Sequence, residues 1–340
     1  MRSISRRGFL ATGAAAIGGL TAIARRVAAD PIGLPIGLQL YTVREQAGKD
    51  FEGTLKEVAA IGYQEVELYS FFDRTAGDVR RALEGAGLKC VSAHYGVPAL
   101  REDLAASIDS AKELGLRFII CPFPGVVDPA RLKAGGPSFT DSLTLDDWKW
   151  NADLFNKVGK EAKKAGLRFG YHNHHIEFRE FGGVTAFDEL LRRTDADLVT
   201  IELDCGWVKV AGLDPAEFIA KHASRVGLLH VKDVKAGPAP STRFGPAVPF
   251  AEVGRGSIDW REVFAAAKKA GVGRYLRRAG HHRAAPAGGD QDQPRLPARP
   301  EGRVIAPRTP GVTECGAAPG LRNSSGGEPR RHPATLRRPG

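Results

Sequence analysis

The sequence is poor in cysteine and lacks an apolar run long enough to cross a membrane. Its four cysteines show no close spacing, and three of them fall in predicted strands: Cys90, Cys121, Cys205 and Cys315. They are therefore expected to be buried thiols and not a disulfide framework. The apolar stretch 11–24 is shorter than the ~20 residues of a spanning helix, which argues against a stable membrane anchor. With 42% apolar and 26% charged residues in 340, the chain is neither collagen-like, coiled-coil nor polytopic.

Acidic residues are absent from residues 1–29, and lysine, methionine and aromatic residues are absent from residues 277–340. The formal net charge of +10 comes from these two segments, which hold five and 12 arginines. The second segment has five acidic residues, so the part of the chain between the two carries a net charge of −2. A mildly acidic body argues against nucleic acid as a partner.

The first 29 residues have the layout of an export signal. Ser5-Arg6-Arg7-Gly8-Phe9-Leu10 precedes the apolar stretch, and the small residues Ala28-Ala29 precede Asp30. This pattern resembles a twin-arginine signal peptide. The resemblance implies export through the twin-arginine machinery and a periplasmic location, and an uncleaved membrane anchor is the alternative.

Short apolar runs alternate with amphipathic helical stretches from residue 36 onward. Strands are predicted at 36–42, 63–69, 88–95, 116–123, 167–174, 198–205 and 226–232, with helices at 50–61, 75–86, 100–114, 145–165, 185–193, 214–223 and 259–270. Strands separated by helices pair in parallel through right-handed crossovers. Seven such units over residues 30–276 predict an α/β fold, a (β/α)8 TIM barrel. A doubly wound sheet is less favoured because no glycine-rich phosphate loop follows the first strand.

Alternation along the strands predicts which side chains face the barrel interior. Polar residues occupy the inward positions near the C-terminal strand ends, the face where barrels place active sites. The predicted inward set is Gln39, Tyr41, Glu65, Glu67, Ser92, His94, His172, His174, Glu202, Asp204, His230 and Lys232. Burying so many polar groups unpaired would cost several kcal/mol, so a binding site is indicated.

Three segments carry the candidate chemistry: Tyr171-His172-Asn173-His174-His175-Ile176-Glu177-Phe178, Glu202-Leu203-Asp204-Cys205-Gly206-Trp207 and His230-Val231-Lys232-Asp233. Carboxylates and an imidazole from consecutive strands suit Mn²⁺, Mg²⁺ or Co²⁺. Together with Gly37-Leu38-Gln39-Leu40-Tyr41-Thr42, these segments resemble the sugar phosphate isomerase/epimerase family, which has a xylose isomerase-like TIM barrel. The resemblance covers roughly residues 34–276.

The resemblance implies one divalent metal held by Glu177, Asp204 and His230, with His174 as a competitor of Glu177 and Glu202 as a supporting residue. It further implies catalytic roles for Glu177, Lys232 and His94. The substrate, a keto sugar or sugar derivative, is expected to contact Glu67, His172, His174, Trp207 and Asp233. The implied reaction is isomerisation or epimerisation by proton abstraction beside a carbonyl, through an enediolate stabilised by the metal.

The eighth β/α unit is expected to be lost. After residue 276 the family pattern predicts a strand ending in Val-Glu-Gln-Asp, but the chain continues Arg277-Arg278-Ala279-Gly280 and is rich in proline, glycine and arginine. Codons for residues 276–280 can be chosen so that removal of one base restores Leu-Val-Glu-Gln-Asp. Residues 277–340 are therefore interpreted as an out-of-frame, disordered tail, with a genuine basic disordered tail as the alternative. The expected consequence is an open barrel seam, poor stability and impaired activity.

Three other functions compete with the isomerase. A metal-dependent dehydratase or lyase acting on a keto sugar or cyclitol shares the step that forms the enolate. A nuclease of the endonuclease IV type would need more metal ligands and a basic face. A non-catalytic carbohydrate-binding protein or an inactive remnant would retain the fold without the reaction. Self-association into a homo-oligomer is left open.

Overall fold

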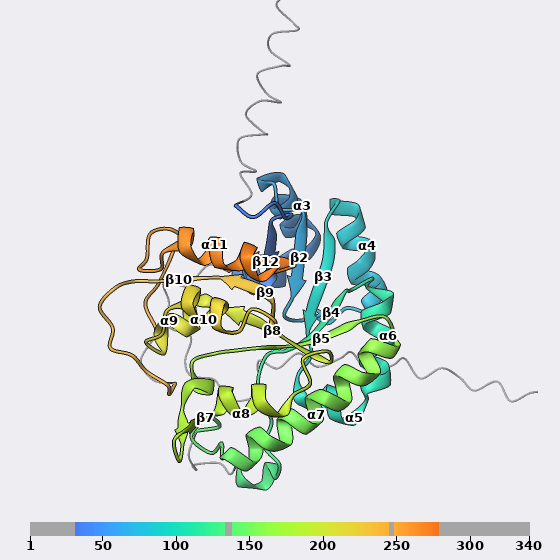
Figure 1. Ribbon diagram of the computed structural model, residues 1–340. Helices are drawn as coiled ribbons and strands as arrows, with labels where there is room; N and C mark the ends of the chain where they lie inside the picture. Colours follow the sequence, from blue (N-terminus) through green and yellow to red (C-terminus); the bar gives the residue numbers. More distant parts are fainter. Residues whose placement is uncertain (1–30, 133–137, 245–247, 279–340) are drawn as a thin grey trace, which may run out of the picture. The chain divides into compact units, whose positions relative to one another are not determined.

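The computed structural model describes residues 31–132, 138–244 and 248–278. The eight barrel strands are β1 (Gly37–Gln39), β2 (Glu65–Leu68), β3 (Lys89–His94), β4 (Phe118–Cys121), β5 (Arg168–His172), β8 (Val199–Asp204), β9 (Val226–Val231) and β12 (Arg274–Arg277). They form a closed parallel barrel in the order β1-β12-β9-β8-β5-β4-β3-β2. All seven predicted strands are confirmed, and Figure 1 shows the helices outside the strands.

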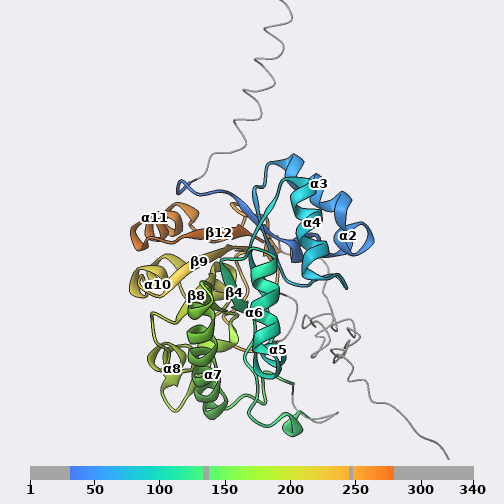
Figure 2. The same ribbon diagram turned by 90° about the vertical axis from the view of Figure 1, so that its right-hand side faces the viewer.

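Helices and short elements connect the barrel strands. They are η1 (Leu40–Val43), α2 (Arg44–Lys49), α3 (Phe51–Ile61), α4 (Ala76–Ala86), α5 (Val97–Glu102), α6 (Leu104–Glu113), η2 (Pro129–Arg131), α7 (Leu145–Lys164), η3 (Ile176–Phe178), β6 (Glu180–Phe181), β7 (Val184–Thr185), α8 (Ala186–Arg193), α9 (Cys205–Val210), α10 (Pro215–Lys221), β10 (Asp233–Val234), β11 (Phe250–Ala251) and α11 (Trp260–Ala270). Figure 2 gives the view at right angles, in which α7, α8, α10 and α11 follow one another around the barrel. None of the helices in the described part of the chain combines the length and apolarity that crossing a membrane requires.

The helix ends follow local sequence signals. Helix α7 begins with a capping box, in which the Thr144 side chain and the Asp147 side chain each accept a bond from the other's backbone N–H. Two backbone donors that a helix start would leave unpaired are thereby satisfied. Helix α3 ends at Gly62, whose φ of 110° is easily adopted only by glycine.

The eighth strand is present, so the predicted loss of the eighth unit is wrong for the strand. Residues 274–277 of β12 pair with residues 228–231 of β9, and Leu276 and Arg277 pair with Gly37 and Leu38 of β1. Tyr275 and Leu276 are buried, which supplies the apolar contacts that the closing strand needs. A strand of only four residues closes the seam, because strand pairing depends on backbone hydrogen bonds and side-chain burial within the strand. The composition of the segment that follows it matters less.

The polar members of β12 are also accommodated. Arg274 Nε lies 3.1 Å from Glu65 Oε2 inside the barrel, at the N-terminal ends of the strands. Above this pair a small apolar group fills the interior, formed by Phe118, Ile120 and Leu228. Gly170 leaves space for it, since a Cβ at that position would lie 2.8 Å from Ile120 Cδ1. The interior is therefore packed below the C-terminal strand ends.

Several predictions fall outside the described residues. The export signal of residues 1–29 and the tail from residue 279 onward both do, as does Cys315. Cys90, Cys121 and Cys205 are free and buried, as predicted. Arg277 and Arg278, which the sequence pattern assigns to the tail, belong to the described barrel.

Candidate metal centre

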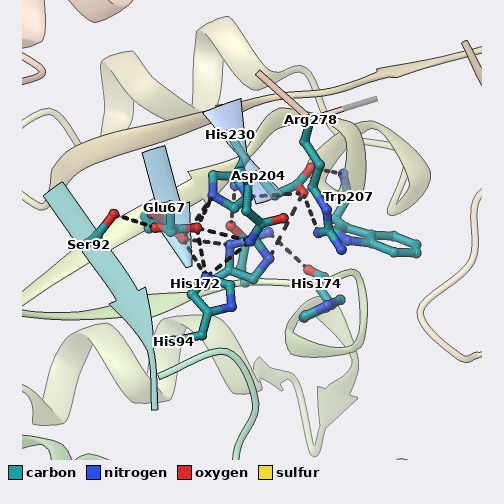
Figure 3. A network of polar contacts seen from close by, with 12 residues as sticks. Glu67, Ser92, His94, His172, His174, Asp204, Trp207, His230 and Arg278 are labelled. Carbon is teal, nitrogen blue, oxygen red and sulfur yellow. Dashed lines mark hydrogen bonds and ion pairs between the residues drawn. The ribbon is translucent and has the colours of Figure 1, made fainter. Parts of the chain in front are cut away.

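Polar side chains from six strands meet at the C-terminal end of the barrel (Figure 3). The polar cluster consists of Gln39, Glu67, Ser92, His94, His172, Glu202 and His230, and none of these residues is more than 6% exposed. Strand pairing aligns them, because Gln39 is in register with Glu67, and His172 with Glu202. Side-chain alternation from the sequence predicted each of these residues to face inward.

Glu67 is the centre of one half of the cluster. Its Oε1 accepts a hydrogen bond from Gln39 Nε2 at 2.9 Å and lies 2.8 Å from His230 Nε2. Its Oε2 accepts one from Ser92 Oγ at 2.6 Å. Burial opposes ionisation of this carboxyl, but the charges and hydrogen bonds of His94 and His230 lower its pKa well below the usual value. Glu67 is therefore a carboxylate in the folded protein.

Glu202 is the centre of the other half. Its Oε2 lies 3.0 Å from His172 Nδ1, 3.2 Å from His230 Nε2 and 3.3 Å from His94 Nε2. Burial, followed by the nearby negative charge of Glu67, raises the pKa of Glu202 well above its ordinary value. The pKa values of these two buried carboxyl groups, which share His94 and His230, are thus shifted in opposite directions, as like charges at close range require.

The donor atoms fit a divalent metal. His94, His172, Glu202 and His230 can each offer one ligand atom, and these atoms lie within 4.8 Å of one another. Glu202 Oε1 and His230 Nδ1 are buried without a hydrogen-bond partner in the described part of the chain. Since buried polar atoms are normally paired, these orphans are what a bound cation or substrate oxygen would satisfy. Three imidazoles make the set richer in nitrogen than predicted, which disfavours the hard, oxygen-seeking Mg²⁺.

Asp204, one of the predicted ligands, lies beside this set. Its Oδ1 accepts a bond from the Trp207 backbone N–H at 3.2 Å and so caps helix α9. Its Oδ2 faces His230 Nδ1 at 3.8 Å and His172 Nε2 at 4.0 Å. Asp204 and His230 therefore lie together at the site, with Asp204 Oδ2 facing the histidines.

Glu177, the third predicted ligand and a predicted catalytic residue, is held elsewhere. Its Oε1 accepts a hydrogen bond from Tyr171 Oη at 2.5 Å, and its Oε2 accepts one from the His174 backbone N–H at 2.9 Å. Tyr171 packs against Phe155 of α7, on the outer side of the barrel wall. Both oxygens of the Glu177 carboxyl, which lies in η3, are therefore hydrogen-bonded within the protein, and the residue is not among the four possible metal ligands. Burial raises its pKa to about 7.

Lys232, Trp207 and His174 are buried next to one another, and their contact with the substrate stays a prediction. Lys232 Nζ lies 4.3 Å from the ring centre of Trp207 and 3.5 Å from that of Phe250. Burial lowers the pKa of Lys232 well below its ordinary value. Trp207 Nε1 is buried without a hydrogen-bond partner among the described residues. The His174 ring stacks on Phe123 at 4.1 Å.

Asp233 was predicted to contact the substrate, but both of its carboxylate oxygens accept hydrogen bonds from the protein itself. Its Oδ2 accepts bonds from the N–H groups of Gly254, Gly256 and the Trp260 indole at 2.8–3.1 Å. Its Oδ1 accepts bonds from the backbone N–H of Val234 and Ile258. The residue anchors the loop that follows β11 to the end of β9.

Sequence reasoning missed Arg278 as a member of the site. Its Nη1 lies 3.5 Å from Asp204 Oδ2, and its guanidinium lies 4.9 Å from the ring centre of Tyr41. Extending the alternation of β12 from Arg274 through Leu276 would have placed it inward. The residue was not predicted to be in the site because residues 277–340 were interpreted as a disordered tail.

Comparison with known proteins agrees with the fold. A family model described as "Xylose isomerase-like TIM barrel" matches residues 55–277. An inosose dehydratase of Geobacillus thermodenitrificans is 27% identical over 258 residues, which cover 70% of this chain and 84% of that protein. A solved sugar phosphate isomerase/epimerase of Parabacteroides distasonis is 25% identical with a TM-score of 0.56, covering 76% of this chain and 93% of that one. A second from the same organism is 23% identical with a TM-score of 0.58, covering 73% and 87%.

The predicted family is therefore confirmed in fold, in strand order and in the polar C-terminal face. The chain belongs to the xylose isomerase-like TIM barrel family.

Proposed function

We propose that this protein is a divalent-metal-dependent dehydratase that removes water from a keto sugar or a keto cyclitol. The observation that carries the proposal is the buried polar cluster, in which Glu67 and Glu202 share His94 and His230 and four side chains can each offer a ligand atom to one metal. The similarity to inosose dehydratases favours elimination over the isomerisation expected from the sequence. This choice is the alternative that the sequence left open.

The chain's residues suit an elimination beside a carbonyl. Such a reaction needs a base for the C–H next to the carbonyl and an acid for the leaving hydroxyl. His94, His172, Glu202 and His230 would hold the metal, which when bound polarises the carbonyl and acidifies the neighbouring C–H. Lys232 at the rim is placed to accept the proton, with Trp207 beside it as a wall for the substrate ring. Glu67 keeps His94 and His230 oriented through its hydrogen bonds.

The test incubates the full chain, first stripped with a chelator and then reloaded with Mn²⁺ or Co²⁺, with a keto-inositol in deuterium oxide. After the reaction the paramagnetic metal is removed, and mass spectrometry and proton NMR identify the products formed from the substrate. Loss of one water with a matching new enone or diketone supports the proposal. The variant Glu202→Gln should lower the rate at least about 100-fold, because it removes the only carboxylate among the four proposed metal ligands. The exposed Glu180→Gln is the matched control and should leave the rate unchanged.

An isomerase or epimerase is the second candidate, supported by the fold and by the 25% identity to a solved sugar phosphate isomerase/epimerase. The same experiment separates the two. Exchange of one carbon-bound hydrogen for deuterium without loss of water favours isomerisation. Binding of a keto-inositol with neither exchange nor elimination favours a carbohydrate-binding protein without catalysis. Export by the twin-arginine pathway and a periplasmic location stay predictions, tested by fractionating cells that carry Arg6→Lys and Arg7→Lys.

A further inference from the structure

Arg278 brings a permanent positive charge into the metal centre. Its backbone N–H donates to the Val231 carbonyl at 3.1 Å, which extends the ladder of β12 by one residue and turns the side chain inward. The side chain is only 12% exposed. Figure 3 shows it descending toward Asp204, opposite the histidines. Its neighbour Arg277 carries the same charge but is exposed.

The contact between Arg278 and Asp204 involves the carboxylate oxygen of Asp204 that faces the metal centre. Because Oδ1 caps helix α9 through the Trp207 N–H, Oδ2 is left to face the site. That oxygen lies 3.5 Å from Arg278 Nη1 and 3.8 Å from His230 Nδ1. A cation bound to Oδ2 would therefore stand directly beside the guanidinium. At such separations in a poorly solvated site, repulsion between the two charges is strong.

We infer that Arg278 is a positioning residue that neutralises Asp204 and competes with a divalent metal for its Oδ2, so that it sets the metal affinity of the centre. This inference rests on the metal site of the proposed function. The guanidinium is held between Asp204 and the Tyr41 ring, and metal binding to Asp204 requires it to move away. The four-residue set of His94, His172, Glu202 and His230 would hold the metal without Asp204 while Arg278 stays in place.

The experiment measures Mn²⁺ binding to the full chain at pH 7.5 and fixed ionic strength, from the electron paramagnetic resonance signal of free Mn²⁺. The variants are Arg278→Gln, Arg278→Met, Asp204→Asn and the double variant Arg278→Gln/Asp204→Asn. Arg277→Gln is the matched control, since it removes the same charge from the adjacent exposed position. Circular dichroism and thermal unfolding without metal verify that each variant is folded.

The expected result is that Arg278→Gln and Arg278→Met tighten Mn²⁺ binding by at least about tenfold, whereas Arg277→Gln changes it less than about twofold. In the Asp204→Asn background the gain from Arg278→Gln should shrink to the smaller part that charge repulsion alone supplies, because the oxygen in competition is gone. Equal effects of the Arg278 and Arg277 variants, or a gain of the same size without Asp204, would overturn the inference and leave the metal site intact. Absence of Mn²⁺ and Co²⁺ binding in every variant would reject the metal-dependent function and this inference together.

Discussion

His230 Nε2 lies 2.8 Å from Glu67 Oε1, although 163 positions separate the two residues in the chain. Glu67 is on β2 and His230 on β9, with β1 and β12 between them in the barrel. The contact therefore exists only because the barrel is closed. It joins the first quarter of the chain to the last described strands inside the cluster that we propose for catalysis.

Replacing Glu67 should destabilise the protein strongly. Glu67→Ala leaves His230, His94 and Gln39 buried without their shared acceptor. Breaking a buried charged network of this kind costs about 3–5 kcal/mol of unfolding free energy. Urea denaturation followed by circular dichroism measures the loss. The control is Glu57→Ala, an exposed carboxylate on α3, with an expected change within about 0.5 kcal/mol. Equal urea midpoints for the two variants would contradict the role given to Glu67.

The contribution of Glu177 to stability should fall as the pH rises from about 5 to 7. Burial raises the pKa of Glu177 to about 7, above its ordinary value of 4.5. The folded state therefore binds a proton that the unfolded state releases in this window, and stability is lost as that proton dissociates. The effect amounts to at most about 3 kcal/mol.

Glu177→Gln should remove this dependence, because the amide does not titrate. The measurement is the difference in unfolding free energy between the wild type and the variant at several pH values. A difference that stays constant from pH 5 to 8 would show that Glu177 does not have a raised pKa.

Truncation should separate the closing strand from the rest of the C-terminal segment. Deleting residues 274–340 removes β12 and exposes the backbone edges of β1 and β9, so we expect aggregation and no cooperative unfolding. Deleting only residues 279–340 retains every β12 pair and should preserve cooperative unfolding. Size-exclusion chromatography and thermal unfolding by circular dichroism read out both chains. Similar behaviour of the two truncations would mean that β12 is not what closes the barrel.

Gly256→Ala tests the anchor at Asp233. A Cβ at Gly256 would lie 2.0 Å from Asp233 Oδ1 and 2.6 Å from the Val234 carbonyl oxygen. We expect a loss of about 1–3 kcal/mol, because the loop must move off the carboxylate. Gly48→Ala in helix α2 is the control, since no atom lies within 4 Å of its Cβ position. That change should stabilise the protein by up to about 1 kcal/mol. Chemical denaturation that ranks the two variants in the opposite order would contradict the close packing at Asp233.

Much of the fold and the composition of the cluster could be predicted from the sequence. Seven strands and the inward-facing histidines could be predicted from the alternation of side chains along each apolar run and from the polar residues near its end. This alternation indicates which side chains of a strand face the barrel interior. The eighth strand was missed, since its four residues carry two arginines whose partners, such as Glu65, are far away in sequence. The contacts of Glu177 could not be predicted because η3 turns the chain after β5. Those of Asp233 could not be predicted because four of its five N–H donors come from residues 254–260, more than 20 positions away.

The barrel seam at β12 is uneven. Four residues of β12 are in register with β9, but only two are in register with β1. Gly37 permits the close approach there, since a Cβ would lie 2.5 Å from Leu276 Cδ2. Local opening follows the side with fewer ladder bonds, so amide protons of β1 should exchange with solvent before those of β9. A barrel that opens along this line separates the Arg278 guanidinium from the Tyr41 ring but leaves it beside Asp204, because β12, β9 and β8 stay paired, so the charge pair of the polar centre survives the opening.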